Sequence, residues 1–192
     1  MRTRTTVAAV LLLGATACSS NDAKPAPTVT VTKTAASSPG SAAPSASSAT
    51  YAFGQPWEFE SSEGNASTFD GTVTVLGYKQ GVTSVGSASE EAGQSGYVWA
   101  YADLKLCVTQ GSYSDDNTSW TLYYSDGSRI DPSSSTYDDF PKPEFPVQVT
   151  VTEGKCARGK LVFPVPEGKR PASVLYSPPG LATPTEWTVP KA

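Results

Sequence analysis

Histidine is absent from the 192-residue chain, and this absence excludes several common kinds of active site. Hydrolysis by a Ser-His-Asp or Cys-His arrangement needs an imidazole base, and many zinc sites need imidazole ligands. No glycine-rich phosphate loop precedes a helical pattern. The sequence therefore predicts a protein that is not an enzyme and that holds no cofactor.

Carboxylates are the catalytic groups that remain, and several occur as neighbouring pairs. Such pairs can perform acid–base hydrolysis, so a carboxylate-dependent hydrolase stays an alternative. The pairs lie in polar, serine-rich segments that we expect to be solvated loops: Glu90/Glu91, Asp115/Asp116 and Asp138/Asp139. Calcium could also use loop oxygens, although no EF-hand spacing is present. The weak calcium candidates are Asp115, Asp116, Asp126, Asp138 and Asp139.

Cysteine is scarce, with three residues in the chain. Cys18 lies near the N-terminus, which leaves Cys107 and Cys156 as an even pair in a domain that we expect to be exported. A disulfide between them would close a loop of about 50 residues and stabilise the fold by roughly 4 kcal/mol in the chain-entropy treatment. Two separate thiols or a redox pair are the alternatives, but no C-x-x-C motif is present.

Long apolar runs are also missing, and residues 7–13 form a compact apolar stretch too short to span a bilayer. Arg2 and Arg4 precede this stretch, and small residues lead from it into Cys18. The pattern is typical of a signal peptide over residues 1–17, and its ATAC end resembles the lipobox of bacterial lipoproteins. We expect a lipid on Cys18 that anchors the chain to the outer face of the cell membrane. The alternative is ordinary cleavage near Ala17.

Large apolar side chains are almost absent from residues 18–50, which are rich in Ser, Ala, Pro and Thr. Such a segment cannot bury enough surface to offset the entropy of ordering its backbone. We therefore expect a disordered linker whose root-mean-square reach is roughly 30 Å.

Basic residues are fewer than acidic ones, 14 against 18, and Arg2 and Arg4 belong to the predicted signal peptide. An acidic chain repels phosphate backbones, so nucleic acid is not an expected partner. The same sign of charge disfavours direct docking on anionic lipid headgroups.

Residues 51–192 show no lasting helical period and read as short alternating strands separated by turns. The clearest alternation runs over residues 97–108, and further strands are predicted around residues 57–59, 73–75, 120–124, 145–151, 161–165, 174–176 and 187–189. One open sheet would leave an apolar face in water. We therefore predict an all-β, two-sheet, immunoglobulin-like sandwich.

Four motifs support a family resemblance: GTVTVLGYK at 71–79, DLKLCV at 103–108, WTLYYSDGSRI at 120–130 and KCARGKLVFPVPEG at 155–168. Together they resemble the telokin-like, immunoglobulin-like domain of unknown function numbered 4352, which is common in bacterial lipoproteins. Thr109 stands where many relatives have Asn. The resemblance implies an extracellular sandwich with no established activity and supplies no catalytic residues.

Aromatic residues on one side of the predicted 97–108 strand form a candidate binding surface. Tyr97, Trp99 and Tyr101 share the side opposite the aliphatic residues, and Tyr123 lies in a neighbouring predicted strand. Exposed aromatic rings often dominate binding surfaces, whereas buried ones would only support packing. We predict a membrane-anchored binding module, with a secreted or envelope protein or a glycan as candidate partner. A structural surface protein without a ligand is the alternative.

Overall fold

The computed structural model describes residues 49–61, 68–179 and 184–191. The elements, in chain order, are β1 (Ala49–Tyr51), β2 (Trp57–Glu60), β3 (Asp70–Val82), α1 (Ala88–Glu91), β4 (Tyr97–Gln110), β5 (Ser112–Asp116), the 3-10 turn η1 (Asn117–Ser119), β6 (Trp120–Tyr123), β7 (Arg129–Ile130), β8 (Gln148–Thr152), β9 (Lys155–Pro166), β10 (Ser173–Tyr176) and β11 (Thr185–Thr188). The predicted signal peptide, the predicted lipid site at Cys18 and the predicted linker up to residue 48 lie outside the described residues.

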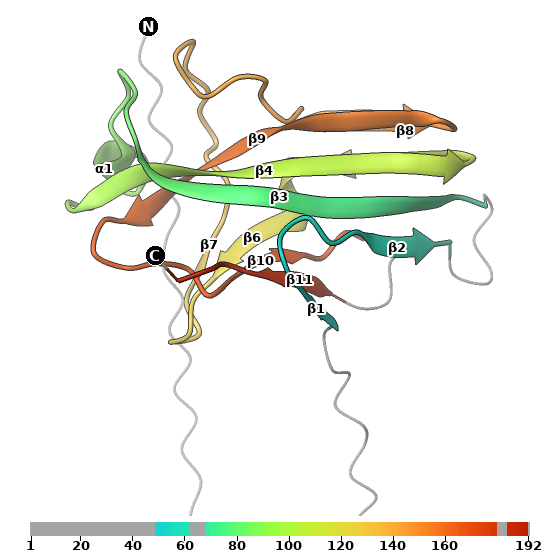
Figure 1. Ribbon diagram of the computed structural model, residues 1–192. Coiled ribbons are helices and arrows are strands. Elements are labelled where there is room, and N and C mark those ends of the chain that lie inside the picture. The colour runs from blue at the N-terminus through green and yellow to red at the C-terminus, as the bar shows by residue number, and fades with distance from the viewer. Residues whose placement is uncertain (1–48, 62–67, 180–183, 192) are drawn as a thin grey trace, which may run out of the picture. The chain divides into compact units, whose positions relative to one another are not determined.

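Two sheets pack face to face, which confirms the predicted all-β sandwich (Figure 1). One sheet has the strand order β2-β3-β4-β9, and every pairing in it is antiparallel. The other has the order β1-β11-β10-β6-β7, with β1 running parallel to β11. A smaller two-stranded sheet pairs β5, which follows β4 in the chain, with β8, which precedes β9, in antiparallel register.

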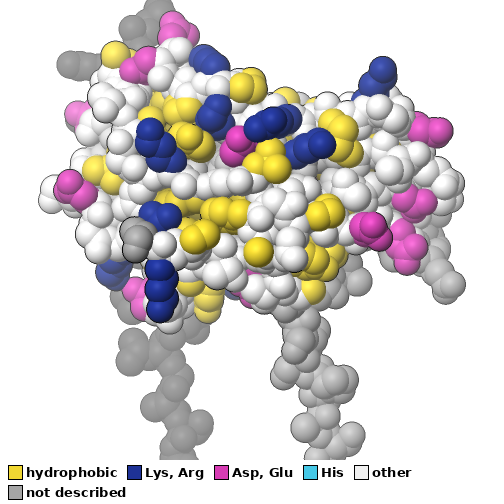
Figure 2. All heavy atoms as spheres, viewed as in Figure 1, with side chains coloured by type: hydrophobic (Ala, Val, Ile, Leu, Met, Phe, Trp, Pro, Cys, Tyr) yellow, Lys and Arg dark blue, Asp and Glu magenta, His cyan; other side chains and the backbone are white. Residues whose placement is uncertain are grey.

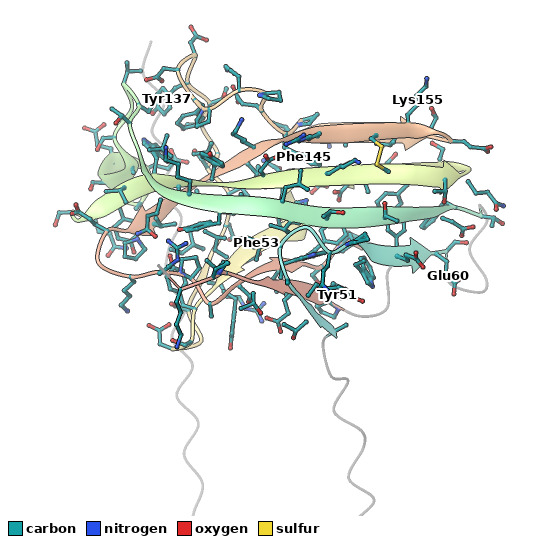
Figure 3. The ribbon with its side chains drawn as sticks, viewed as in Figure 1. Tyr51, Phe53, Glu60, Tyr137, Phe145 and Lys155 are labelled. Atoms are coloured by element: carbon teal, nitrogen blue, oxygen red, sulfur yellow. A yellow bond between two sulfur atoms is a disulfide. The ribbon has the colours of Figure 1, made fainter. Side chains whose placement is uncertain are left out.

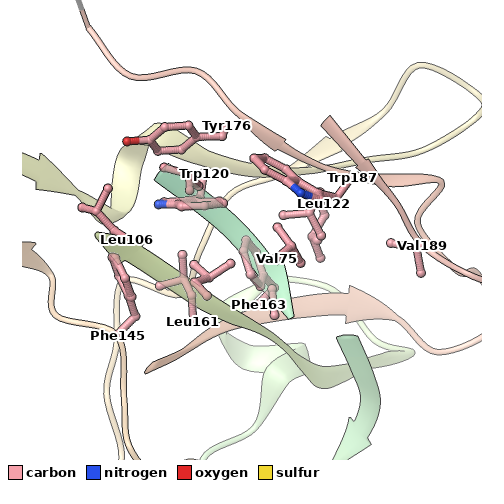
Figure 4. Close-up of a cluster of buried hydrophobic side chains, with 14 of the residues drawn as sticks. Val75, Leu106, Trp120, Leu122, Phe145, Leu161, Phe163, Tyr176, Trp187 and Val189 are labelled. Carbon is pink, nitrogen blue, oxygen red and sulfur yellow. The ribbon is translucent and has the colours of Figure 1, made fainter. Parts of the chain in front are cut away.

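Alternation along the long strands fills the space between the sheets with apolar side chains. Leu106 and Phe163, from β4 and β9, are fully buried there. Trp120, Tyr176 and Trp187 face them from the second sheet (Figure 4). The ring of Trp120 lies 4.3 Å from that of Tyr176 and 6.3 Å from that of Trp187, centroid to centroid. Burial of each such ring contributes roughly 4–6 kcal/mol as an upper value, so this aromatic cluster is a major stabilising part of the core.

The β5–β8 pair corrects the sequence prediction for residues 112–116, which we expected to be a solvated loop. Tyr113 and Asp115 point inward and are buried, whereas the serines between and before them are exposed. Tyr113 pairs with Val151 and Asp115 with Val149 on β8. Gly154, with φ +70°, provides the left-handed residue in the turn from β8 to β9. The segment is therefore a half-buried strand.

The face of the β2-β3-β4-β9 sheet that points away from the core is covered at one end only. There α1 and the connection between β7 and β8 enclose a small second cluster of Ala88, Trp99, Phe140 and Val162. Trp99 packs edge-on against Phe140 at 5.0 Å between centroids, and its Nε1 donates to the Gly86 carbonyl at 2.8 Å. The other end of this outer face has no such cover among the described residues, and it forms the surface considered below.

The predicted disulfide between Cys107 and Cys156 is confirmed. The two residues are direct partners in the β4–β9 ladder, and both side chains lie on the outer face (Figure 3). None of the helices in the described ranges is both long and apolar enough to cross a membrane.

Candidate binding surface

A cluster of cations occupies the uncovered end of the outer sheet face. Lys79, Lys105, Arg158 and Lys160 take outward positions on β3, β4 and β9, alternating with core residues. Lys142, from the β7–β8 connection, lies beside them, because the Lys160 Nζ donates to its carbonyl oxygen. We call these five residues the basic face; Figure 2 shows dark-blue side chains gathered over β3, β4 and β9. These are five of the fourteen lysines and arginines in a chain with a formal net charge of −4.

Like charges stand directly opposite each other on this face. Lys105 and Arg158 are cross-strand partners, an arrangement that destabilises a sheet. Asp103 partly offsets it, because the Arg158 Nη2 donates to its Oδ2 at 3.1 Å and this contact raises the pKa of Arg158. Among the described residues, no carboxylate forms an ion pair with Lys79, Lys105 or Lys160. The basic face therefore retains a net positive charge.

Tyr101 lies between two of the lysines. It is the direct partner of Lys79 across the β3–β4 pairing, and the Lys160 Nζ lies 5.7 Å from the centroid of its ring. A cation over a tyrosine ring gains about 0.5–1 kcal/mol at an exposed site. The half-buried ring thus holds the Lys160 ammonium in place and serves as part of the floor of the basic face.

The backbone of the β7–β8 connection is fixed to the edge of β9. The Phe145 amide donates to the Lys160 carbonyl at 3.0 Å, and the Lys160 amide donates to the Pro143 carbonyl at 2.8 Å. Gly159 allows this approach, because a Cβ there would meet the backbone of Glu144 and Phe145. Glu144 accepts from Lys142 and from the Thr136 hydroxyl, and these contacts hold the pKa of Glu144 below its usual range. Lys142 is thereby placed at the margin of the basic face.

The opposite margin of the same sheet is acidic. Glu58 and Glu60 point outward from the edge strand β2, and Asp70 is the direct partner of Glu60 on β3. These carboxylates line a groove of about 550 Å³ together with Thr72 and Thr109. The outer face therefore carries cations on β3, β4 and β9, with Asp103 among them directly opposite Lys160, and anions along β2 and at the start of β3.

The predicted aromatic surface is not one exposed patch. Trp99 is 3 % exposed beneath the β7–β8 connection, while Tyr97 and Tyr101 are half-buried around the same small cluster. Tyr123 belongs to β6 in the other sheet, where Arg129 covers its ring at 5.7 Å. Tyr101 is the member of the predicted set that contacts the basic face, and the lysines around it were not among the predicted site residues.

The five acidic calcium candidates are dispersed over the sandwich. Asp126 accepts from the Ser128 hydroxyl at 2.5 Å, from the Lys169 Nζ at 2.9 Å and from the Ser128 amide at 3.0 Å, contacts that lower its pKa. Asp116 accepts from the Thr118 amide, Asp139 accepts from Ser84 and Val85, and Asp138 is exposed. Within the part of the chain that the structure describes, no three acidic or cysteine side chains gather into a metal-binding group.

Asp115 is a buried acid in the core, with 6 % of its surface exposed. Its carboxyl oxygens make no hydrogen bond of ordinary geometry with the described protein atoms, although Ser119, Trp120 and Tyr176 surround it. Burial raises the pKa of Asp115, and these neighbouring donors oppose the rise. Nearby, the hydroxyls of Tyr113 and Tyr176 lie 3.1 Å apart. Asp115 thus belongs to a polar group inside the core, away from the basic face.

Comparison with known proteins gives the fold a precedent. No known protein family matches the chain, so the resemblance to the numbered domain stays a prediction, and no curated protein matches it. The secreted protein MPT63 of Mycobacterium tuberculosis has a similar structure, with a TM-score of 0.57 and 17% identity, over 75% of this chain and 99% of that one. The yjhA protein of Bacillus subtilis matches at a TM-score of 0.48 and 12% identity, over 73% and 99% of the two chains. The likeness to MPT63 supports the shared fold alone.

Proposed function

We propose that this protein is an exported, lipid-anchored binding module without catalytic activity, and that the basic face is its contact surface. The signal-like residues 1–17 and the lipobox-like approach to Cys18 support export and anchoring. The fold supports a binding role, because a two-layer sandwich provides a rigid sheet face on which side chains can be displayed.

One observation carries the proposal: cations are concentrated on a rigid face of an acidic protein. The juxtaposition of Lys105 and Arg158 costs stability, and nothing in the core requires it. Charged groups on adjacent strands steer and orient an oppositely charged partner. The disulfide joins the same two strands two residues away from this pair, at Cys107 and Cys156. It therefore holds β4 and β9 together next to the two like charges.

Anchoring is tested by metabolic labelling with an alkyne fatty acid in a bacterial host. The full chain should incorporate the label and partition into the detergent phase, and Cys18→Ser should do neither. If the Cys18→Ser variant is still labelled, or the wild type is not labelled, the anchoring part of the proposal is wrong.

The binding role is tested by placing a photo-crosslinking amino acid at Thr72, an outward position between the disulfide and Glu58, where the basic face borders the acidic groove. The matched control position is Thr188, an exposed residue on the other sheet. We expect a discrete crosslinked product from Thr72 that weakens when Lys79 and Lys105 are both changed to Gln. Equal products from the two positions, or none from Thr72, would favour a structural surface protein without a ligand.

A further inference from the structure

We propose that the partner of the basic face is a linear phosphodiester polymer of the cell envelope. This inference rests on the proposed function and names the chemistry of the ligand. It follows from the spacing of the cations, from the kind of cation used, and from the relief of the surrounding surface.

The cations form a track across three strands. Arg158 and Lys160 are two residues apart on β9, which separates them by about 6.7 Å along the strand. Lys105 lies one strand away from Arg158, at about 4.8 Å between strand axes, and Lys79 lies on the third strand opposite Tyr101. The track is therefore roughly 15 Å long. A flexible chain with one charge per repeat can contact these cations one after another.

The chemistry of the cations favours phosphate over carboxylate. Four of the five are lysines, which bind phosphate as point charges without a fixed geometry. The one arginine, whose fork would suit a carboxylate best, already donates to Asp103 at 3.1 Å. Tyr101 is half-buried beneath Lys160, so it offers no open ring on which a nucleic-acid base could stack. These features favour a polyol or sugar phosphate chain.

The shape of the surface favours a linear polymer over a flat membrane as the partner. The β7–β8 connection rises above the plane of β9 (Figure 1), and its Lys142 borders the cations on the sheet. A planar bilayer would meet this raised connection before it reached the sheet, whereas a narrow polymer can lie beside it. The exposed large apolar side chains among the described residues are Val85 and Val147, and neither lies on β3, β4 or β9. The carboxylates of β2 repel the polymer from the far edge of the sheet, so that it contacts the cations of β3, β4 and β9.

The test measures the binding of the full chain to fluorescein-labelled synthetic poly(glycerol phosphate) by fluorescence anisotropy over a series of salt concentrations. Three to four phosphate contacts should give a slope of log K against log salt of about −2 to −3. The double change Lys79→Gln/Lys105→Gln should reduce this slope by about 1.4 and weaken binding roughly tenfold or more at low salt. The matched control, Arg129→Gln/Lys191→Gln, alters net charge equally away from the basic face and should change binding less than about twofold.

Other outcomes would overturn the inference. Equal losses in the two double variants would mean that net charge alone drives binding. Equal binding of poly-glutamate would show that phosphate is not preferred, and binding to phosphatidylglycerol vesicles without polymer binding would assign the face to the membrane. If the polymer fails to bind while the Thr72 crosslink persists, the polymer is wrong but the proposed binding function stands. If neither is seen, both proposals fail.

Discussion

Replacement of Gly159 by Ala tests whether the close approach of the β7–β8 connection to β9 builds one border of the basic face. A Cβ at residue 159 would collide with backbone atoms of Glu144 and Phe145, which cannot move aside as a flexible side chain could. Overpacking of this kind costs about 1–3 kcal/mol, and we expect the upper part of that range because Phe145 is anchored in the core. A loss of about 3 kcal/mol corresponds to a fall in Tm of roughly 6–12 °C.

Gly77 provides the matched control for this substitution. It lies in β3 of the same sheet, and a Cβ there would meet no atom within 4 Å. Gly77→Ala should therefore be neutral or stabilising by up to about 1 kcal/mol, because alanine restricts the unfolded chain. Thermal unfolding followed by circular dichroism separates the two variants. If Gly159→Ala unfolds at the same temperature as Gly77→Ala, the described contact between the connection and β9 is wrong.

Three further predictions concern the rest of the sandwich. Cys107→Ala/Cys156→Ala should lower the free energy of unfolding by up to about 4 kcal/mol, measured by urea titration, and reductant should then have no further effect on the variant. Burial raises the pKa of Asp115, so the folded chain keeps that proton to higher pH than the unfolded chain and stability falls as pH rises above about 4. The free energy of unfolding of Asp115→Asn should hence equal that of the wild type at about pH 3 and exceed it at about pH 7. A difference in this free energy that stays constant across pH would contradict this reasoning. Trp99→Ala should cost about 3–5 kcal/mol if the small outer cluster is as well packed as the core, and a loss below about 1 kcal/mol would show that it is not.

The strands of the sandwich could be predicted where apolar and polar residues alternate clearly. Residues 97–108 lie within β4, and residues 161–165 lie within β9. Between Ser112 and Asp116 the same alternation is present, but an acid takes one of the inward positions. Because carboxylates are rarely buried, the pattern indicates a loop. The burial of Asp115 depends on Trp120 in β6 and Tyr176 in β10, and the sequence alone does not show that these strands pack against it.

The candidate site was harder to predict, because it depends on strand order and on what covers each face. Net charge alone suggests repulsion of phosphate, yet it carries no information about how charges are distributed. Lys105 occupies a polar position of the predicted 97–108 strand, whereas Arg158 lies before the predicted 161–165 strand. The two residues become neighbours only when β4 is paired with β9 in the observed register. The burial of Trp99 likewise required the long connection that places Phe140 over it. The alternation predicted the side of the sheet that Trp99 faces, and the tertiary structure determined its exposure.

The edges of the two sheets have a consequence for copies of this protein held close together. Unpaired strand edges are templates for aggregation, and native proteins protect them by shortness, charge or cover. Here β1 and β7 at the edges of one sheet contain three and two residues, and β2 carries outward glutamates. The long edge of β9 is covered near its middle by the Pro143–Phe145 segment. A crowded array on a two-dimensional surface would therefore resist edge-to-edge polymerisation, and each copy would remain an independent unit.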